Sequence, residues 1–438
     1  MKKQDMKKVK HKKAWMIAYI TAAALILLLN LAAWSSTAFC DWYLEHIFPV
    51  WVNTYGRFMD LFPFSVGEIM LGLGALLAAA ALLLWIPFAV SKAIDTAAGK
   101  RVVRGAVKTA VKTAAKTADK TAIAVEQSGG ADSGEKRSGL RRGICAFYRF
   151  FFRALLAVCL VMTLNCTILY HASTFSENYI SREERKFETE TQASAGAYTL
   201  EELIAVRNLV VEACNELCLE MQRDENGTIL YEGSLTDQAI LCMQDLGKIY
   251  PRLAGYYPHP KPLAVSDFFS QQYMCGYYFP FSMEANYNDV MYIMNLPATM
   301  CHELAHLRGY IYEDEANFIS YLACISSDDP VFVYSGYLSV LNYLDNDFYK
   351  AVGRDREAYL AQPHILRQVT EDNIFLTQED WDRINKKAVI DTETVDKVSD
   401  TLVEATLKAN GVADGMFSYN RVVELLLEYY RESSASLE

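Results

Sequence analysis

The segment TMCHELAHLRGYIYEDEANFISYLAC, residues 299–324, places two of the chain's seven histidines four positions apart, with a glutamate beside the first. We expect a helix over about residues 297–308, because the proline that begins it suits a first turn and Gly309 suits the position just past the last turn. On this helix, His302 and His306 project from one face. The segment therefore presents a pair of imidazoles around which the rest of the domain can be interpreted.

Two imidazoles one helical turn apart can bind one Zn²⁺ at the ~2.0–2.1 Å that such bonds need. Glu303, next to the first histidine, lies near the open coordination position, which is the HExxH arrangement of a zinc ligand pair with a general base. An ordinary amphipathic helix that spells the pattern by chance is the alternative. Histidine is scarce in this chain, and the flanking Met300, Leu304 and Leu307 suit a buried helix. We therefore predict one Zn²⁺ per chain, with Glu303 as the catalytic base.

A zinc enzyme needs a third protein ligand. One known scheme requires histidine at position 312, where this chain has Tyr312. The other scheme takes a glutamate from a following helix, and Glu313 and Glu315 are both available. On a helix, Glu313 shares a small and polar face with Ala316 and Asn317, whereas Glu315 shares its stripe with large apolar residues. Glu313 is the preferred ligand and Glu315 remains the alternative.

HELAH followed by E-x-x-A-N resembles the gluzincin clan of zinc metallopeptidases, to which the CAAX-prenyl-protease and heat-shock membrane proteases belong. The resemblance implies a zincin-like fold. It also implies His302, His306 and Glu313 as zinc ligands, Glu303 as base, and Asn317 as a residue that supports the ligands.

Three apolar runs precede the histidine segment. The first two have the length of about 20 residues that a membrane-spanning helix needs. The third is shorter, but the aromatic and Arg side chains of FYRFFF beside it suit a membrane interface. The predicted spans are residues 14–34, 69–90 and 154–170.

Charge predicts the orientation of these spans. Seven lysines lie in the first 13 residues, and residues 91–145 carry twelve Lys/Arg against five Asp/Glu, so both segments are expected in the cytoplasm by the positive-inside rule. Residues 1–171 form the membrane region, and residues 172–438 are then extracytoplasmic. The first part carries 22 Lys/Arg and 10 Asp/Glu and the second 20 and 43. So acidic a domain argues against nucleic acid as a partner.

The domain over residues 172–438 is expected to be α+β, mostly helical with a small sheet. Thr199 and Glu202 form the capping box of a long first helix, and a second helix follows near residues 235–249. PLAVSDFF (262–269) and GYYFPFSMEANYN (276–288) indicate strands. The start of the second is either an edge strand that pairs with an extended substrate or a core strand. From Pro297 to about Arg431 the pattern is helical.

The three spans, GYYFPFSMEANYN, HELAHLRGYIYEDEANF and KANGVADGMFSYNRVVELLLEYYR together are similar to a family of uncharacterised bacterial membrane proteins defined as a domain of unknown function. This resemblance implies the membrane architecture and the zinc motif, and no substrate.

Several other polar residues are secondary candidates. Tyr310, Tyr312 and Tyr419 are candidate hydrogen-bond donors to an oxyanion. His259 and His364, each beside a proline, are interpreted as structural. The six cysteines after residue 171 show no disulfide or metal-binding spacing and are expected to be buried free thiols.

Together these features predict a membrane-anchored, multi-pass, extracytoplasmic zinc metallopeptidase of gluzincin type. Its partners would be the lipid bilayer and a protein or peptide substrate of the envelope or surface. The alternative is a zinc-stabilised, non-catalytic binding or sensor module, against which Glu303 argues. An intramembrane protease is disfavoured, because His302 lies more than 130 residues beyond the last span among frequent charges.

Overall fold

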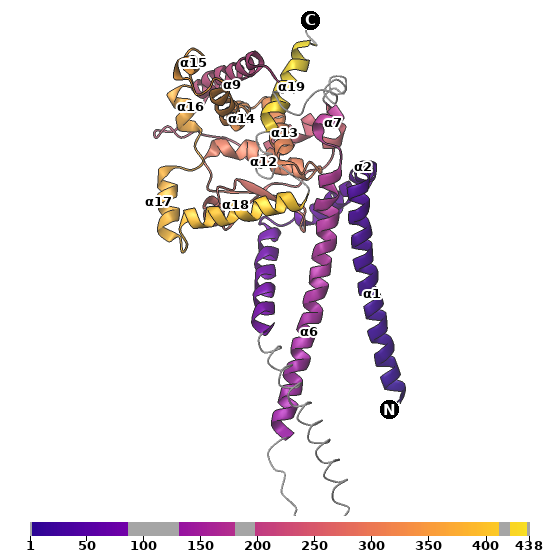
Figure 1. Cartoon of the computed structure of the whole chain (residues 1–438). Coiled ribbons are helices and arrows are strands. Elements are labelled where there is room, and N and C mark those ends of the chain that lie inside the picture. Colours follow the sequence, from indigo (N-terminus) through magenta and orange to yellow (C-terminus); the bar gives the residue numbers. More distant parts are fainter. Residues whose placement is uncertain (1, 86–130, 180–197, 411–420, 436–438) are drawn as a thin grey trace, which may run out of the picture. The chain divides into compact units, whose positions relative to one another are not determined.

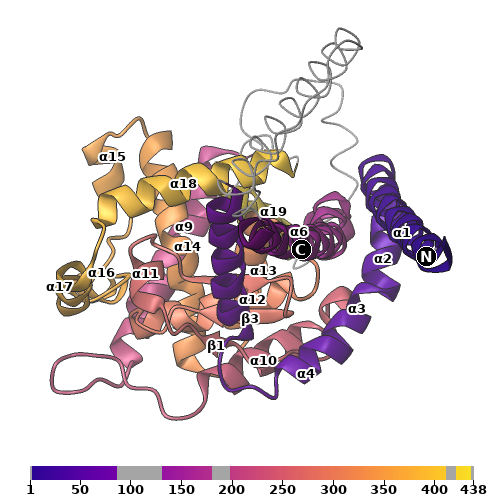
Figure 2. The ribbon, with the colours of Figure 1, turned by 90° about the horizontal axis from the view of Figure 1, so that it is seen from below.

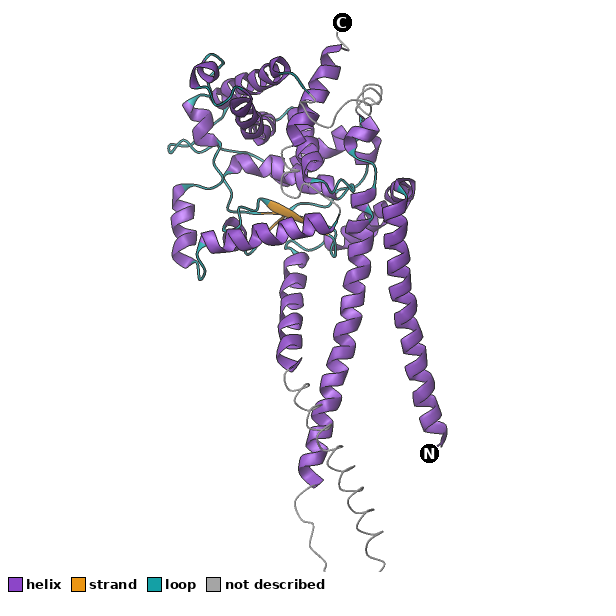
Figure 3. Ribbon diagram, in the orientation of Figure 1, coloured by secondary structure: helices purple, strands orange, loops and turns teal. Residues whose placement is uncertain are grey.

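The computed structural model describes residues 2–85, 131–179, 198–410 and 421–435. This part of the chain is mostly helical and carries one small sheet (Figures 1 and 3). The expectation of a mostly helical chain with a small sheet is therefore confirmed.

Three helices are long and apolar enough to cross a membrane, which confirms the three predicted runs. The first lies in α1 (Lys2–Ser35), and the third includes most of α6 (Ala131–Met162) and the short turns after it. The third begins earlier than the sequence suggested, and residues 86–90 of the second fall outside the described residues. The three segments that could span a membrane are Ala14–Ser35, Val66–Trp85 and Arg142–His171.

The chain divides into two compact units. One unit holds residues 1–68 and 160–438, and the other holds residues 69–159. Within the second unit, the hydroxyl of Tyr148 donates to the carbonyl of Ala81 at 2.7 Å. Residues 1–68 thus group with the domain after residue 171, although the sequence pattern assigned them to the membrane region.

The segment between the first two spans explains this grouping. Leu44, Phe48 and Val52 are buried in the same apolar core as the residues of the C-terminal domain. In addition, the Asp41 carboxylate accepts from the backbone N–H of Ser173 at 2.7 Å and from its hydroxyl at 2.6 Å. The helical pieces of the segment are α2 (Thr37–His46), α3 (Phe48–Trp51), a π-helical turn (Val52–Gly56) and α4 (Arg57–Met59).

The C-terminal domain begins with short turns and two longer helices. The predicted capping box is present: the Thr199 hydroxyl accepts from the Glu202 backbone N–H, and the Glu202 carboxylate accepts from that of Thr199. The elements are a π-helical turn (Thr163–Thr167), a 3₁₀ turn (Leu169–His171), α7 (Phe175–Tyr179), α9 (Leu200–Glu220), α10 (Leu235–Leu246) and a 3₁₀ turn (Pro251–Leu253).

The sheet has the order β1-β3-β2, so β2 is an outer strand. The strands are β1 (Lys261–Pro262), β2 (Gly276–Phe279) and β3 (Glu284–Tyr287). β1 runs parallel to β3, and β2 and β3 form an antiparallel hairpin. The prediction of strands within residues 276–288 is therefore confirmed.

The strand predicted over residues 262–269 is wrong beyond its first residue. The chain leaves β1 and forms the short helix α11 (Ser266–Ser270). The Glu68 carboxylate binds the backbone N–H groups of Ala264 and Val265, and the Ser266 hydroxyl donates to the Leu263 carbonyl. These tertiary and local bonds replace the ladder bonds of a strand, which the apolar pattern alone could not reveal.

Helices make up the rest of the described chain. Short helices connect the long ones, and α17 and α18 follow one another across a brief turn (Figure 2). The elements are a 3₁₀ turn (Ile293–Asn295), α12 (Leu296–His306), α13 (Glu313–Ile325), α14 (Pro330–Ala351), α15 (Arg356–Leu360), α16 (Arg367–Asp372), α17 (Gln378–Lys387), α18 (Thr392–Ala409) and α19 (Val422–Ala435).

All ten cysteines are free thiols. Among the six that follow residue 171, only Cys275 is exposed, and the other five are buried as expected. Cys301 of α12 and Cys324 of α13 lie with their sulfur atoms 3.8 Å apart. Such small side chains let the two helices that carry the candidate ligands pack closely.

Candidate metal centre

Helix α12 carries His302 and His306 on one face, with ring centroids 4.7 Å apart. Pro297 lies in its first turn, as the sequence predicted. The helix ends at His306, and Gly309 then adopts a φ of +83°, a conformation that side chains with a Cβ rarely adopt. The chain turns sharply there and enters the helix that supplies the third group of the site.

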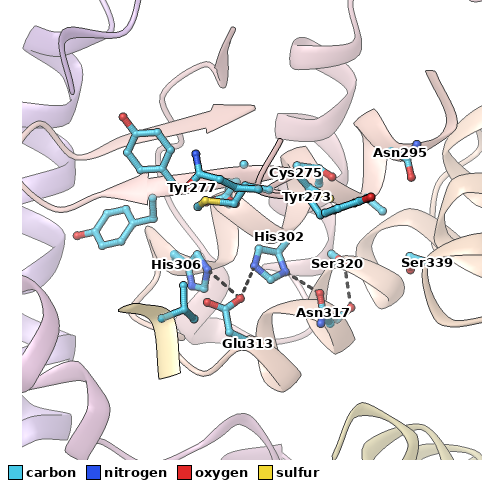
Figure 4. A pocket seen from close by; sticks show the side chains of 18 of the residues that line it. Tyr273, Cys275, Tyr277, Asn295, His302, His306, Glu313, Asn317, Ser320 and Ser339 are labelled. Atoms are coloured by element: carbon cyan, nitrogen blue, oxygen red, sulfur yellow. Dashed lines mark hydrogen bonds and ion pairs between the residues drawn. The ribbon is translucent and has the colours of Figure 1, made fainter. Parts of the chain in front are cut away.

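Glu313, the first residue of α13, brings its carboxylate to both histidines (Figure 4). Its Oε2 atom lies 3.0 Å from Nε2 of His302 and 3.9 Å from Nε2 of His306. One donor atom from each of the three residues lies within 4.8 Å of the others, so this group could hold a metal ion.

The Nδ1 atom of each histidine lies within hydrogen-bond distance of an oxygen atom. Nδ1 of His302 lies 2.8 Å from Oδ1 of Asn317, and Nδ1 of His306 lies 2.7 Å from the carbonyl oxygen of Tyr310. Both partners are acceptors, so each Nδ1 carries the proton and donates it. In the neutral imidazoles, the Nε2 lone pairs then point toward Glu313, which is the orientation that metal ligands require.

Burial and the neighbouring charges move the pKa values of these groups. Burial, together with the charge of His302, lowers the pKa of His306 to about 4, so His306 is neutral at neutral pH. Burial also opposes protonation of His302, but the hydrogen bond and charge of Glu313 outweigh it and raise that pKa. The carboxylate of Glu313 is thus a strong electrostatic partner for an inward-facing cation.

Glu303 lies beside the histidines and is only 4% exposed. Burial, with a contribution from the charge of Glu313, raises the pKa of its carboxyl to about 8. Its Oε2 atom has no hydrogen-bond partner among the described residues. A Cβ at Gly276 would come within 2.8 Å of its Oε1 atom, so strand β2 passes directly over this carboxylate. Glu303 is therefore a buried, unpaired acid at the wall of the site.

Glu315, the alternative ligand, does not lie with the histidines. Its Oε1 atom accepts from the backbone N–H of Phe175 at the start of α7. Burial, and next the charge of Asp314, raises the pKa of the Glu315 carboxyl to about 8. Glu315 therefore holds the start of α7 against α13, and it is Glu313 that lies beside the two histidines.

The side chains of the two described tyrosine candidates, Tyr310 and Tyr312, have other partners than the histidines. The ring of Tyr310 is buried against Phe175 and Arg252, away from the histidines, and only its carbonyl oxygen contacts the site. The hydroxyl of Tyr312 donates to the carbonyl of Tyr170 at 2.7 Å. Tyr419 lies outside the described residues. Neither described hydroxyl is directed at the metal group.

A cleft with a volume of about 600 Å³ opens onto the three candidate ligands and Glu303. Its walls come from the chain before and within β2, from α13 and α14, and from α18. The part formed by α18 includes Asp396, Ser399, Asp400 and Val403. The cleft is therefore closed on one side by a helix far along the chain from the histidines.

The sequence interpretation missed several residues of this site. Gly276 is one, although an isolated glycine at the start of a strand signals a close approach of another group. The carbonyl of Tyr310 carries no signal, because any residue there would provide it. Tyr170 and Tyr343 also line the cleft, and among 27 tyrosines nothing in the sequence marks them.

Comparison with known families places the chain. The model of one family, described as protein of unknown function (DUF3810), matches residues 133–427. Comparisons with curated proteins and with solved structures found no match. The matched region covers the third apolar helix, the sheet, α12, α13 and α18. The chain therefore belongs to the DUF3810 family of proteins of unknown function.

Proposed function

We propose that this protein is a membrane-anchored zinc metallopeptidase that hydrolyses peptide bonds in proteins or peptides. The observation that carries the proposal is the convergence of His302, His306 and Glu313, with the buried acid Glu303 beside them. The His-Glu-x-x-His pattern on α12 and the glutamate at the start of α13 are the residues by which the sequence resembles gluzincins.

The three candidate ligands fit zinc. Two imidazole nitrogens and one carboxylate oxygen are a donor set of catalytic zinc sites, which leave a fourth position for water or substrate. Both histidines hold their Nδ1 protons on acceptors, so their Nε2 atoms are available. The Oε2 atom of Glu303 has no hydrogen-bond partner among the described residues, so it can accept a hydrogen bond from a water molecule beside the ligands. Bound at this site, zinc supplies Lewis acidity toward a water molecule and a substrate carbonyl.

The chain's own residues then handle the protons. Glu303 is positioned to accept a proton from the attacking water and to pass it to the leaving amine. Burial raises the pKa of its carboxyl to about 8, close to neutral pH. The carboxylate form is therefore a stronger base than an ordinary glutamate, and the acid form holds the proton until it is passed on. Asn317 and the Tyr310 carbonyl keep the two imidazoles in their ligating orientation throughout.

Strand β2 supports a peptide substrate. It is one of the two outer strands of the sheet, and residues 273–278 line the cleft beside Glu303. An extended peptide can add to such an edge through main-chain hydrogen bonds, which place a scissile carbonyl near the metal group without regard to most side chains. This favours the edge-strand interpretation of GYYFPF over that of a core strand.

The orientation of the membrane spans belongs to the same proposal. The lysine-rich N-terminus and the basic segment 91–145 favour the cytoplasmic side, and the acidic domain favours the outer side. The substrates would then be envelope or surface proteins.

The test compares wild type with Glu303→Gln, using the full-length protein in lipid nanodiscs loaded with one equivalent of zinc. We expect wild type to cleave members of a fluorescence-quenched peptide library. Because a positioned general base contributes about 10²–10⁴-fold to the rate, Glu303→Gln should lose at least ~100-fold in activity. Its zinc content should stay unchanged, because Glu303 is not a ligand.

Comparable cleavage by the two proteins would show that Glu303 is not the base. Tight zinc binding without cleavage of any library peptide by wild type would instead favour the alternative function, a zinc-stabilised binding or sensor module.

A further inference from the structure

A group of exposed apolar side chains gathers on three elements beside the cleft. Val389 is 99% exposed, which is extreme for an apolar residue in an ordered turn. The group, called here the apolar rim, comprises Val265 and Phe268 at α11, Val389 and Ile390 in the turn between α17 and α18, and Val398 and Leu402 on α18.

Hydrogen bonds connect α11 with α17 and with the turn before α18. The Gln271 side-chain amide, just after α11, donates to the carbonyl of Ile390 at 3.0 Å and to the Thr392 hydroxyl at 3.3 Å. Arg383 of α17 donates to the Asp267 carboxylate of α11 at 2.6 Å. These bonds hold α11 against α17 and against the turn that leads into α18, and the three helices are labelled in Figure 2.

The start of the second predicted span is hydrogen-bonded to the chain at the apolar rim. The span begins at Val66, and Glu68 lies in its first turn. Both oxygens of the Glu68 carboxylate accept backbone N–H groups next to the rim, from Ala264 at 2.9 Å and from Val265 at 3.0 Å. A helix that enters a bilayer at Val66 thus holds Val265 at the membrane surface.

A second set of hydrogen bonds holds the start of this helix against the sheet. The Glu284 carboxylate of β3 accepts the backbone N–H groups of Val66 at 3.2 Å and Gly67 at 2.7 Å. Lys261 of β1 donates to the same carboxylate at 2.6 Å, and both charged side chains are buried. The start of the span is therefore fixed to the sheet from which β1 leads directly into α11.

Helix α18 presents two opposite faces. Asp396, Ser399 and Val403 line the cleft, whereas Val398 and Leu402, one turn apart, are exposed. The protein-facing side of α18 also buries Val395 and Leu407, and its exposed side carries Val398 and Leu402 among polar and charged residues. Exposed apolar side chains next to charged ones are suited to a membrane interface.

We propose that the apolar rim rests on the surface of the bilayer that the chain enters at Val66, with its side chains in the interfacial region. This contact does not depend on catalysis. If the proposed peptidase function holds, α18 is the wall between the cleft and the lipid, and the cleft takes protein segments close to the membrane.

Photocrosslinking in the full-length protein tests the contact. Benzoylphenylalanine replaces Val389 or Leu402, one position at a time, and the protein is placed in nanodiscs of zwitterionic phosphatidylcholine and irradiated. Leu27 of the first span, 61% exposed, is the positive control, and Leu219 at the end of α9, 73% exposed, is the matched negative control. Lipid adducts are measured by mass spectrometry.

We expect positions 389 and 402 to give lipid adducts at least about tenfold above position 219, because interfacial side chains meet acyl chains and headgroups continuously. Yields equal to that of position 219, with efficient labelling at position 27, would overturn the proposal. Adducts to a second protein chain would overturn it in favour of a contact between copies. Labelling at 389 alone would remove α18 from the contact.

Discussion

Glu313 and Glu315 lie two positions apart on α13 and have different partners. Glu313 faces the two histidines, whereas Glu315 is buried and accepts a hydrogen bond from the backbone N–H of Phe175 in α7. Helical periodicity was sufficient to prefer Glu313, because its neighbours on the helix are small and polar. Asn317 was implied by the resemblance to gluzincins, and the structure places it against His302.

The isosteric variants Glu313→Gln and Glu315→Gln should separate these roles. We expect Glu313→Gln to lose more zinc affinity than the ~10–100-fold that loss of a supporting partner costs, because it removes a ligand charge. Glu315→Gln should bind zinc as wild type does, since its amide oxygen can still accept from Phe175. Competition titration against a chelator measures both in the full-length protein. Metal loss in Glu315→Gln alone would reverse the assignment.

Other features of single residues could not be predicted. The direction of Tyr312 depends on the carbonyl of Tyr170, which lies 142 positions earlier in the chain. Similarly, the fixed proton of His306 depends on a backbone atom and not on a side chain. Sequence patterns identify side chains able to do chemistry, but they carry little information about partners that come from the backbone or from distant segments.

Among the elements, the turn between α12 and α13 decides where Glu313 lies relative to the histidines. It brings Glu313 back to the histidines, and Leu44 of α2 covers it: a Cβ at Gly309 would come within 2.3 Å of Leu44 Cδ2. The glycine and its place just after the helix were evident from the sequence. The contact with α2 was not, because nothing local links residues so far apart.

Gly309→Ala is therefore expected to destabilise the protein more than Gly353→Ala. Both glycines have a positive φ, of +83° and +68°, so both variants meet a backbone cost of about 1–2 kcal/mol. Of the two, Gly309 also has a close neighbour, Leu44, whereas a Cβ at Gly353 meets nothing within 4 Å. In Gly309→Ala this overpacking should lower the free energy of unfolding by roughly 1–3 kcal/mol more.

Thermal unfolding of the full-length variants in detergent measures the difference. Equal melting temperatures for the two variants would show that Leu44 moves aside without cost. A lower melting temperature for Gly309→Ala, with reduced zinc binding, is the expected result, because the same turn positions Glu313.

Other elements show where local patterns succeed and fail. The capping box of α9 and the β2–β3 hairpin follow from the residues that form them, and both are present. The apolar run 262–269 forms mainly a helical turn, because Glu68 binds two of its N–H groups. Local signals predict elements whose hydrogen bonds are local, and they fail where a distant carboxylate takes over those bonds.

At the scale of the whole molecule, the three apolar helices were predictable from length and composition alone. The grouping of residues 1–68 with the C-terminal domain was not. Leu44 and Phe48 lie in a segment between two spans, and in the sequence they resemble any short amphipathic connection. Only their burial in the common core identifies them as part of the domain.

The orientation of the three predicted spans in the membrane can be tested with reporter fusions. We expect alkaline phosphatase fused after residue 438 to be active, because it is exported, and the same enzyme fused after residue 120 to be inactive, because the basic segment stays in the cytoplasm. Green fluorescent protein at the same two positions should give the opposite pattern. An inactive phosphatase and a fluorescent protein at residue 438 would contradict the proposed orientation.

The burial of Leu44 beneath the turn at Gly309 also has a consequence for biogenesis. More than 250 residues separate the two positions, so at the ~5–20 residues per second of synthesis Leu44 waits tens of seconds for its partner. Both later apolar helices are synthesised during that interval. Throughout it, the apolar residues of α2 and α3 have no folded core to enter, and a lipid surface or a chaperone must shield them until the C-terminal domain emerges.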